Sequence, residues 1–264
     1  MRLSWSKLKD RAFEVGLDRG VLYPKSSPAV VWNGLTSVEE NGAESAAAYY
    51  VDGRPFLFLP KPKEYTASIK AFTYPDQFSA IMGVVEATDG MYVDSQMGDA
   101  FDLSYRTFIG NAIDGPQADY KIHLVYNATV APTSIAYATM SNAINPVEFA
   151  WDIQAVPVPV EGYRATAHIV IDTRHMDAAK ISTIEDMLYG DTDSEPEMPS
   201  PLTIFDTLTY GDAIIIIDNG NGTWDALGSY KNIYMIGTGV FQIDNVNAVD
   251  HGDGTFTISS TPGP

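Results

Sequence analysis

Four histidines, at positions 123, 168, 175 and 251, are the side chains best suited to proton transfer or metal binding near neutral pH. Catalytic and zinc-binding histidines often stand at short, fixed spacings, such as two on adjacent turns of a helix. These four have no such spacing, and His123 and His168 lie within strand-like runs. The chain also lacks the motifs of nucleotide-binding proteins and serine hydrolases. We therefore expect no enzymatic activity, no catalytic residue and no metal or cofactor site.

Two acidic turns near the C-terminus are the other group of candidate ligands. Asp218 precedes Asn-Gly-Asn-Gly, and Asp250 and Asp253 flank His-Gly. Their oxygen atoms could bind calcium, but neither turn has the twelve-residue spacing or the final glutamate of an EF-hand. Gly and Asn adopt positive φ at low cost, which favours tight turns between antiparallel strands. We interpret both as hairpin turns and leave open whether they bind a cation.

The elements that must position these side chains are strands. Between residues 101 and 171, about five runs alternate apolar and polar residues with a period of two, which is typical of strands with one buried face. In the first run Phe101 and Leu103 share the apolar face, and in the second Ile122 and Leu124 do. The intervening side chains should then meet solvent, another subunit or a lumen. They are Asp102, Ser104, Arg106, Lys121, His123 and Asn127.

The rest of the chain is less regular. Residues 1–30 combine a weak helical pattern with prolines and predict an extended N-terminal arm. Residues 33–53 are a polar insertion between strand-like segments and predict a loop or a long hairpin. Residues 191–202 are acidic and proline-rich, which is typical of a linker. The main domain should therefore span 1–190, and residues 203–264 should form a small β domain.

Composition excludes several classes of protein. The chain has 264 residues, 45% of them hydrophobic, which is enough for a packed core, and it has no cysteine for a disulfide or a thiolate metal site. Its formal net charge is −18, and the excess of acidic residues disfavours binding to nucleic acid, because phosphate affinity comes from Lys and Arg. We find no secretory signal and no apolar run of membrane-spanning length, so we expect no membrane insertion.

Several runs together carry a resemblance to a known family. The longest are FDLSYRTFIGNAIDGPQADYKIHLVYNATVAPTSIAYATM at 101–140 and PVEFAWDIQAVPVPVEGYRATAHIVIDT at 146–173. With VVWNGLTSV, YYVDGRPF and ASIKAFTYPDQF upstream, they resemble the major tail proteins of long-tailed, siphovirus-type bacteriophages over residues 28–190. The family often has TPV where this chain has Ala155-Val156-Pro157-Val158, a difference that concerns one turn.

The resemblance implies a tail-tube subunit with two packed antiparallel sheets and a flanking short helix, and the small C-terminal β appendage expected at 203–264 lies beyond the residues that it covers. Six copies would form a ring, and stacked rings would form the virion conduit for genome delivery, assembled in the host cytoplasm. The implied partners are further copies of the chain, a tape-measure protein, and terminator and distal tail proteins, with double-stranded DNA passing through unbound. The arm and the 33–53 insertion are then the candidate contacts between rings. In the insertion the candidate residues are Glu39, Glu40, Asn41 and Glu44.

Two other interpretations stay open. The chain has fifteen Tyr and four Trp, and Trp224 and Phe256 lie beside the glycine-rich turns. Exposed aromatic rings of this kind would suit a carbohydrate-binding or adhesin-type β module. A tube terminator or a distal tail component of similar fold would show the same strand pattern. Its copy number in purified particles would be much lower than that of a tube subunit.

Overall fold

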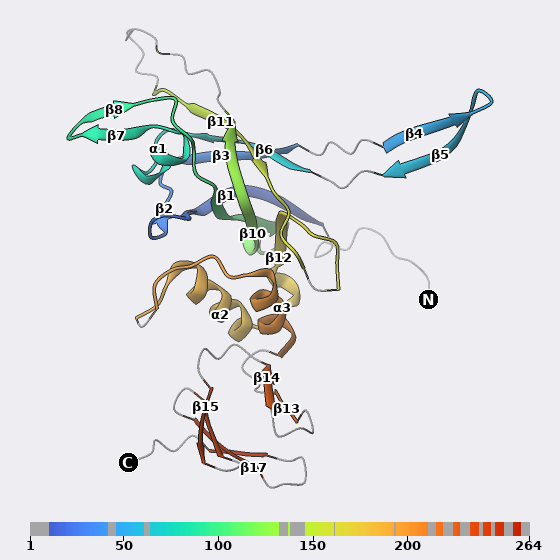
Figure 1. Ribbon diagram of the computed structural model, residues 1–264, viewed down its shortest axis with the longest axis vertical. Coiled ribbons are helices and arrows are strands. Elements are labelled where there is room, and N and C mark those ends of the chain that lie inside the picture. The colour runs from blue at the N-terminus through green and yellow to red at the C-terminus, as the bar shows by residue number, and fades with distance from the viewer. Residues whose placement is uncertain are drawn as a thin grey trace. The chain divides into compact units, whose positions relative to one another are not determined.

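The computed structural model of the chain is mainly β, as the alternating runs predict. It describes residues 11–41, 46–60, 64–131, 137, 146–160, 162–192 and 194–210, and six short strands between 215 and 259. The chain divides into two compact units, one of residues 1–177 with 185–201 and the other of residues 178–184 with 202–264. The main sheet lies in the first unit (Figure 1).

The first unit is built almost entirely of strands. They are β1 (Ala12–Pro24), β2 (Val30–Val31), β3 (Leu35–Asn41), β4 (Ala46–Val51), β5 (Arg54–Pro60), β6 (Tyr65–Ala71), β7 (Val85–Thr88), β8 (Met91–Val93), β9 (Phe101–Asn111), β10 (Gly115–Ala131), β11 (Phe149–Ala155) and β12 (His168–Asp172). A short helix, α1 (Gln77–Ile81), precedes β7, and a 3₁₀ turn, η2 (Thr173–His175), follows β12.

Eight of these strands form one antiparallel sheet in the order β2-β1-β9-β10-β11-β6-β3, with β12 beside β10. Residues 121–125 of β10 pair with both β9 and β12, whereas residues 128–131 pair with β11. β10 therefore passes from a first layer, β2-β1-β9-β10-β12, into a second layer, β10-β11-β6-β3. The two packed sheets implied by the resemblance are present as two layers of one continuous sheet.

A bulge in β10 makes this passage possible. The pairing with β9 shifts register between Val125 and Ala128, and Asn127 has a positive φ of 47°. Asp102, which is 5% exposed, accepts a hydrogen bond from the backbone N–H of Asn127 at 2.7 Å and forms an ion pair with Lys25. A buried N–H without a partner would be destabilising. Asp102 therefore supplies the acceptor that the bulge removes from the strand ladder.

The main core lies between the two layers. Trp32, Phe78, Phe101 and Trp151 form an aromatic cluster with ring centroids 4.6 to 5.8 Å apart. Phe78 comes from α1, so the short helix contributes a core side chain. Each fully buried side chain of this size stabilises the fold by about 1.5–3 kcal/mol. Further core residues from both layers are Leu22, Ala67, Ile69, Leu103, Val125 and Ile153.

The outer face of the first layer is covered by residues 185–201. They include the last turns of α2 (Ala178–Tyr189), which ends at Gly190 with a positive φ of 79°. The Tyr23 hydroxyl donates to the carbonyl of Leu188 at 2.7 Å, and the Tyr126 hydroxyl donates to that of Pro199 at 3.1 Å. Burial raises the pKa of both phenols, so they remain hydrogen-bond donors. The first layer is thus covered on both faces.

The second unit combines helix and short strands. Lys180, near the start of α2, donates to the carbonyl of Leu208 in α3 (Pro201–Tyr210). Six strands follow: β13 (Ile215–Asp218), β14 (Trp224–Leu227), β15 (Ile233–Gly237), β16 (Val240–Ile243), β17 (Val246–Asp250) and β18 (Phe256–Ser259). β13 pairs with β14, and β15 to β18 form a four-stranded sheet. The antiparallel pairs β13–β14 and β17–β18 confirm the two predicted hairpins.

The prediction of an extended N-terminal arm is wrong for residues 12–24. These residues form β1, which pairs with β9 along its length and buries Val21, Leu22 and Tyr23. Two register shifts interrupt β1, and Gly16 and Arg19 have positive φ. Because each shift changes which residues face the core, the sequence shows no uniform alternation. Residues 1–10 lie outside the described residues.

Three other boundaries differ from the prediction. In the 33–53 insertion, Leu35–Asn41 is β3 of the main sheet, and only the second part forms a hairpin. Residues 191–201 of the acidic segment belong to the first unit, where the carbonyl of Pro199 accepts a hydrogen bond from the Tyr126 hydroxyl at 3.1 Å. Residues 203–210 are helical, and only the sequence beyond them contains the predicted strands.

We expect Asp102→Ala to lower the free energy of unfolding by about 2–3 kcal/mol, because it leaves the partly buried N–H of Asn127 without an acceptor. Asp102→Asn keeps an acceptor oxygen and should lose less. Urea denaturation of the full-length chain measures the change. Asp99→Ala is the matched control, since Asp99 is exposed and makes only a 3.3 Å hydrogen bond with Ser26. Equal losses for Asp102→Ala and Asp99→Ala would contradict this role.

Candidate assembly surfaces

Three of the polar strand residues predicted to face outward are buried within the chain. Asp102, Ser104 and Arg106 are 5%, 0% and 7% exposed. The register explains the error: Ile122 lies opposite Arg106, and Leu124 lies opposite Ser104. Residues directly opposite in an antiparallel pair point to the same side. The apolar side chains of β10 therefore share a face with the polar side chains of β9, and residues 185–201 cover that face.

Arg106 is the centre of a charged network on this covered face. It donates two hydrogen bonds to Asp18, at 2.9 and 2.7 Å, and one to Glu185 at 3.1 Å. Its guanidinium also lies 4.3 Å from the ring centroid of Tyr120. Burial alone would lower the pKa of Arg106, but the hydrogen bonds and charges of the two carboxylates outweigh it, and the pKa is raised. The network joins β1 and β9 to α2.

His123 is also buried, on the opposite face of the sheet from Arg106. It lies opposite Tyr105 in the register and stacks on that ring, with centroids 4.6 Å apart. The prediction that it faces solvent, another subunit or a lumen is therefore wrong. Lys121 and Asn127 are only partly buried, and their role at an interface or a lumen stays a prediction.

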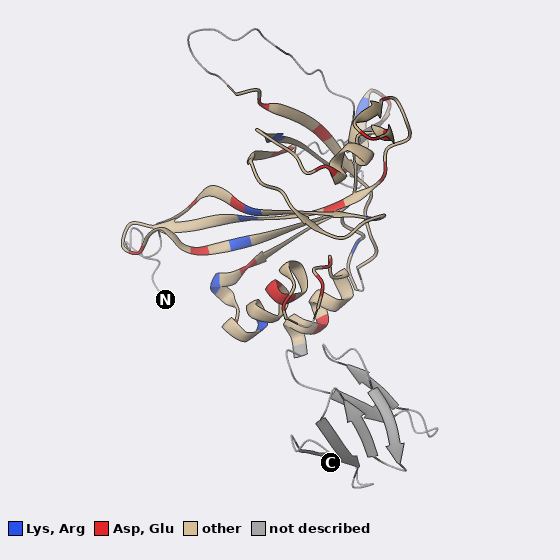
Figure 2. Cartoon of the chain, turned by 90° about the vertical axis from the view of Figure 1, so that its left-hand side faces the viewer, with Lys and Arg blue, Asp and Glu red and all other residues tan. Residues whose placement is uncertain are grey.

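Figure 2 shows Lys and Arg positions near Asp and Glu positions on the strands of the main sheet. Besides the Arg106 network, Lys121 pairs with Glu14 and Lys70 pairs with Glu39. Each pair cancels a positive charge that would attract phosphate. The described part of the first unit therefore presents its basic groups largely in neutralised form.

The described side chains of the β4–β5 hairpin place large apolar groups on both of its faces. Its turn, Asp52-Gly53, has φ values of 52° and 73°, as the two-residue turns that match strand twist require. Successive side chains in a strand point to opposite faces, yet all those described in this hairpin are exposed. Figure 1 shows it as a separate ribbon. The large apolar residues exposed on it are Tyr49, Tyr50, Val51, Phe56 and Leu57.

A second hairpin and two open strand edges are further candidate surfaces. The β7–β8 hairpin exposes Met91, Tyr92 and Val93. β2 and β3 are the terminal strands of the main sheet, and in the described part of the chain no strand pairs with their outer edges. Open edges present unpaired N–H and C=O groups that can pair with another chain.

The four residues predicted to contact a neighbouring ring have different surroundings. Glu39 pairs with Lys70, and Asn41 is exposed at the end of β3. Glu40 accepts a hydrogen bond from Tyr105 at 2.8 Å and faces two histidines. Glu44 lies outside the described residues. The inter-ring role of all four stays a prediction.

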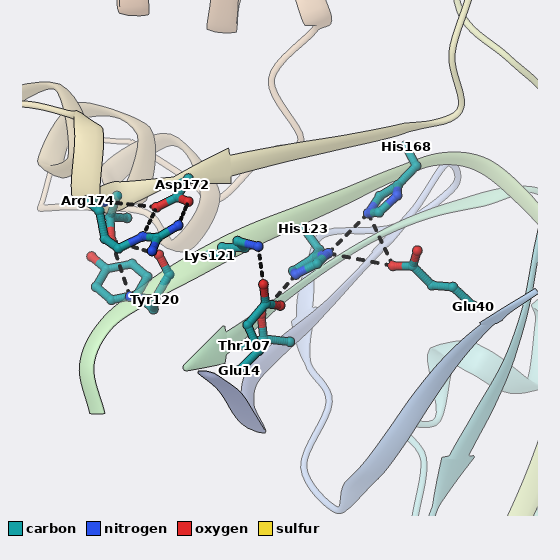
Figure 3. A network of polar contacts seen from close by, with 10 residues as sticks. Glu14, Glu40, Thr107, Tyr120, Lys121, His123, His168, Asp172 and Arg174 are labelled. Atoms are coloured by element: carbon teal, nitrogen blue, oxygen red, sulfur yellow. Dashed lines mark hydrogen bonds and ion pairs between the residues drawn. The ribbon is translucent and has the colours of Figure 1, made fainter. Parts of the chain in front are cut away.

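Sequence reasoning missed the cluster of Glu40, His123 and His168, which Figure 3 shows from close by. The three residues belong to three strands, β3, β10 and β12, and only the fold brings them together. The alternation of residues in β10 would have placed His123 on the core side only if its pairing with Tyr105 had been known. His175 is exposed in η2, outside this cluster, and His251 lies outside the described residues.

No described helix is long and apolar enough to cross a membrane. No protein-family model matches the chain, and no curated protein matches it.

Several solved structures are similar to the chain, among them two parts of an extracellular contractile injection system and one baseplate. The PVC sheath-tube complex of an extracellular contractile injection system in the extended state is 12% identical, with a TM-score of 0.34, and the match covers 58% of this chain and 88% of that chain. The PVC sheath/tube terminator in the extended state is 13% identical (TM-score 0.30, 60% and 97% covered), and the anti-feeding prophage baseplate is 8% identical (TM-score 0.29, 65% and 97% covered). This likeness is too weak to assign a function.

We expect Arg106→Lys to lower the free energy of unfolding by roughly 1–3 kcal/mol, because lysine cannot replace the bidentate contact with Asp18. Chemical denaturation of the purified chain measures the loss. The matched control is Arg174→Lys, which changes the exposed bidentate pair with Asp172. That variant should leave the unfolding midpoint nearly unchanged. Equal shifts of the unfolding midpoint in Arg106→Lys and Arg174→Lys would argue against a structural role for the network.

Proposed function

We propose that this chain is a non-enzymatic structural subunit of a phage tail tube of the siphovirus type. Copies would associate into rings, expected to be hexamers, and the rings would stack into a conduit for the genome. The β4–β5 hairpin carries the proposal. It exposes five large apolar side chains on two faces, and nothing in the described part of the chain covers them.

An isolated two-stranded hairpin is marginally stable in water. A contiguous apolar surface of this kind is typical of a protein interaction site. Burying one exposed aromatic side chain against a partner contributes about 1.5–3 kcal/mol. The partner that we propose for the hairpin is a second copy of the chain. The sequence resemblance implies contact between stacked rings in this region.

The open edges of β2 and β3 support association within a ring. Two subunits in a closed ring meet through two different surfaces, so one edge of each subunit can meet a different edge of its neighbour. Such pairing would satisfy backbone groups that otherwise favour uncontrolled aggregation. The order of the main sheet suits this arrangement, because its two terminal strands, β2 and β3, each leave an outer edge that no described strand pairs with.

The paired charges suit passage of DNA. The formal net charge of −18 repels phosphate within about one Debye length, roughly 8–10 Å at physiological salt. Because Arg106, Lys121 and Lys70 are paired with acids, they offer few free cations to hold a duplex. Under this proposal the tape-measure, terminator and distal tail proteins are partners, and the assembled chain belongs to the virion.

Electron microscopy of the concentrated, full-length protein tests the proposal. We expect rings or tubes in negative stain and a sedimentation profile that shifts to larger species with concentration. A protein that remains monomeric at every concentration would contradict it. In purified particles, a tube subunit must be present in many tens of copies, whereas a terminator or distal component would be present in few.

We expect Phe56→Asp to prevent this assembly while leaving the unfolding of the monomer unchanged, because Phe56 is 75% exposed and makes no core contact. A loss of about 2 kcal/mol per contact weakens association roughly 30-fold. Sedimentation velocity and circular dichroism measure the two effects. Phe205→Asp, at an exposed phenylalanine of α3, is the matched control and should still assemble. Normal assembly of Phe56→Asp would exclude the hairpin from the interface.

A further inference from the structure

Three side chains with metal-binding atoms converge between the two layers of the main sheet. Nδ1 of His123 lies 3.2 Å from Nε2 of His168, and Oε1 of Glu40 lies 3.6 and 3.5 Å from these nitrogens. Around a tetrahedral zinc ion with metal–ligand distances of about 2.0–2.1 Å, ligand atoms lie roughly 3.3–3.4 Å apart. The triangle of donor atoms thus has the size of one face of a zinc coordination sphere (Figure 3).

Neighbouring side chains already orient two of these ligands. Nε2 of His123 lies 3.0 Å from the Thr107 hydroxyl, and when Thr107 accepts the proton of Nε2, Nδ1 keeps its lone pair toward the cluster. The His123 ring also stacks on Tyr105, with an interplanar angle of 7°. The Tyr105 hydroxyl donates to Oε1 of Glu40 at 2.8 Å, which leaves that oxygen a second lone pair. Such outer contacts are typical of metal ligands.

Glu40 is a carboxylate at neutral pH. His123 is the largest cause that lowers the pKa of Glu40 to about 2, with burial opposing it and His168 and Tyr105 contributing further. Among the residues that the structure describes, these three are the one group of histidine and acidic side chains close enough to share an ion.

We propose that Glu40, His123 and His168 bind a divalent transition-metal ion, with zinc as the expected ion, which joins β3 of the second layer to β10 and β12 of the first. Two imidazoles and one carboxylate favour zinc and its neighbours in the transition series over magnesium and calcium, which prefer oxygen ligands. The Glu40 side chain is 38% exposed, so water can occupy the fourth position. The inference does not depend on the proposed function.

Binding requires one local adjustment. The rings of His123 and His168 are nearly parallel, at 15°, so both lone pairs cannot point at one ion without rotation. Tyr105 and Thr107 hold His123, so we expect the adjustment at His168, whose ring packs on that of Tyr65 with centroids 4.8 Å apart. The alternative is a hydrogen-bonded triad without an ion, in which one facing nitrogen carries a proton.

Calorimetry on the full-length chain, treated with a chelator and dialysed, distinguishes the two. We expect one Zn²⁺ or Co²⁺ per chain, visible Co²⁺ absorption of a four-coordinate site, and a rise in Tm of roughly 5–10 °C at a hundredfold excess over Kd. Mg²⁺ and Ca²⁺ should give no comparable rise. Absence of Zn²⁺ and Co²⁺ binding would overturn the proposal and leave the hydrogen-bonded triad.

Variants locate the ion. Glu40→Gln and His168→Asn should each weaken Zn²⁺ binding more than Tyr105→Phe, which removes only a supporting hydrogen bond and should cost about 10-fold. Glu39→Gln and His175→Asn are matched controls outside the cluster and should bind Zn²⁺ normally. Circular dichroism of each variant without metal verifies its fold. Zn²⁺ binding that persists unchanged in folded Glu40→Gln and His168→Asn would place the ion elsewhere and refute the assignment.

Discussion

The bulge of β10 is the constraint on which the first unit depends. One strand serves two layers, and it can do so only where its ladder is broken at Asn127. The cost of that break is an unpaired backbone N–H, which the buried carboxylate of Asp102 satisfies. Once β10 changes layer, the second half of the sheet folds over the first and the aromatic core forms between them. A single polar contact therefore fixes where the sheet turns.

The same layering explains why this unit has polar residues inside and apolar residues outside. Both faces of the first layer are covered, so Arg106 and Ser104 are buried beneath residues 185–201 and must be paired there. The β4–β5 hairpin lacks any covering layer, and its aromatic side chains face solvent. Polar groups are thus satisfied within the chain, whereas the apolar surface of the hairpin is left for another molecule.

Local sequence patterns predicted the strands well and their environments poorly. The alternation in β9 and β10 is visible in sequence, but the face that each residue shares with the next strand depends on register, which alternation within one strand does not define. The pairing of Leu124 with Ser104 therefore reversed one predicted face. β1 was missed because bulges interrupt its period, and the histidine cluster because its members are 83 and 45 residues apart in sequence, between positions 40, 123 and 168.

The position of Glu40 connects the core to the exposed hairpin. Glu40 is the next-to-last residue of β3, and the hairpin begins at Ala46. Its carboxylate contacts residues of β9, β10 and β12, so the end of β3 is held by the first layer as well as by its own partner, β6. Because β6 follows the hairpin and is itself in the main sheet, both strands that flank the hairpin are fixed at their ends. Glu40 therefore lies near the end of the strand that precedes the hairpin we assign to assembly. A ligand bound at Glu40 would change how firmly this strand end is held without contacting the apolar surface of the hairpin.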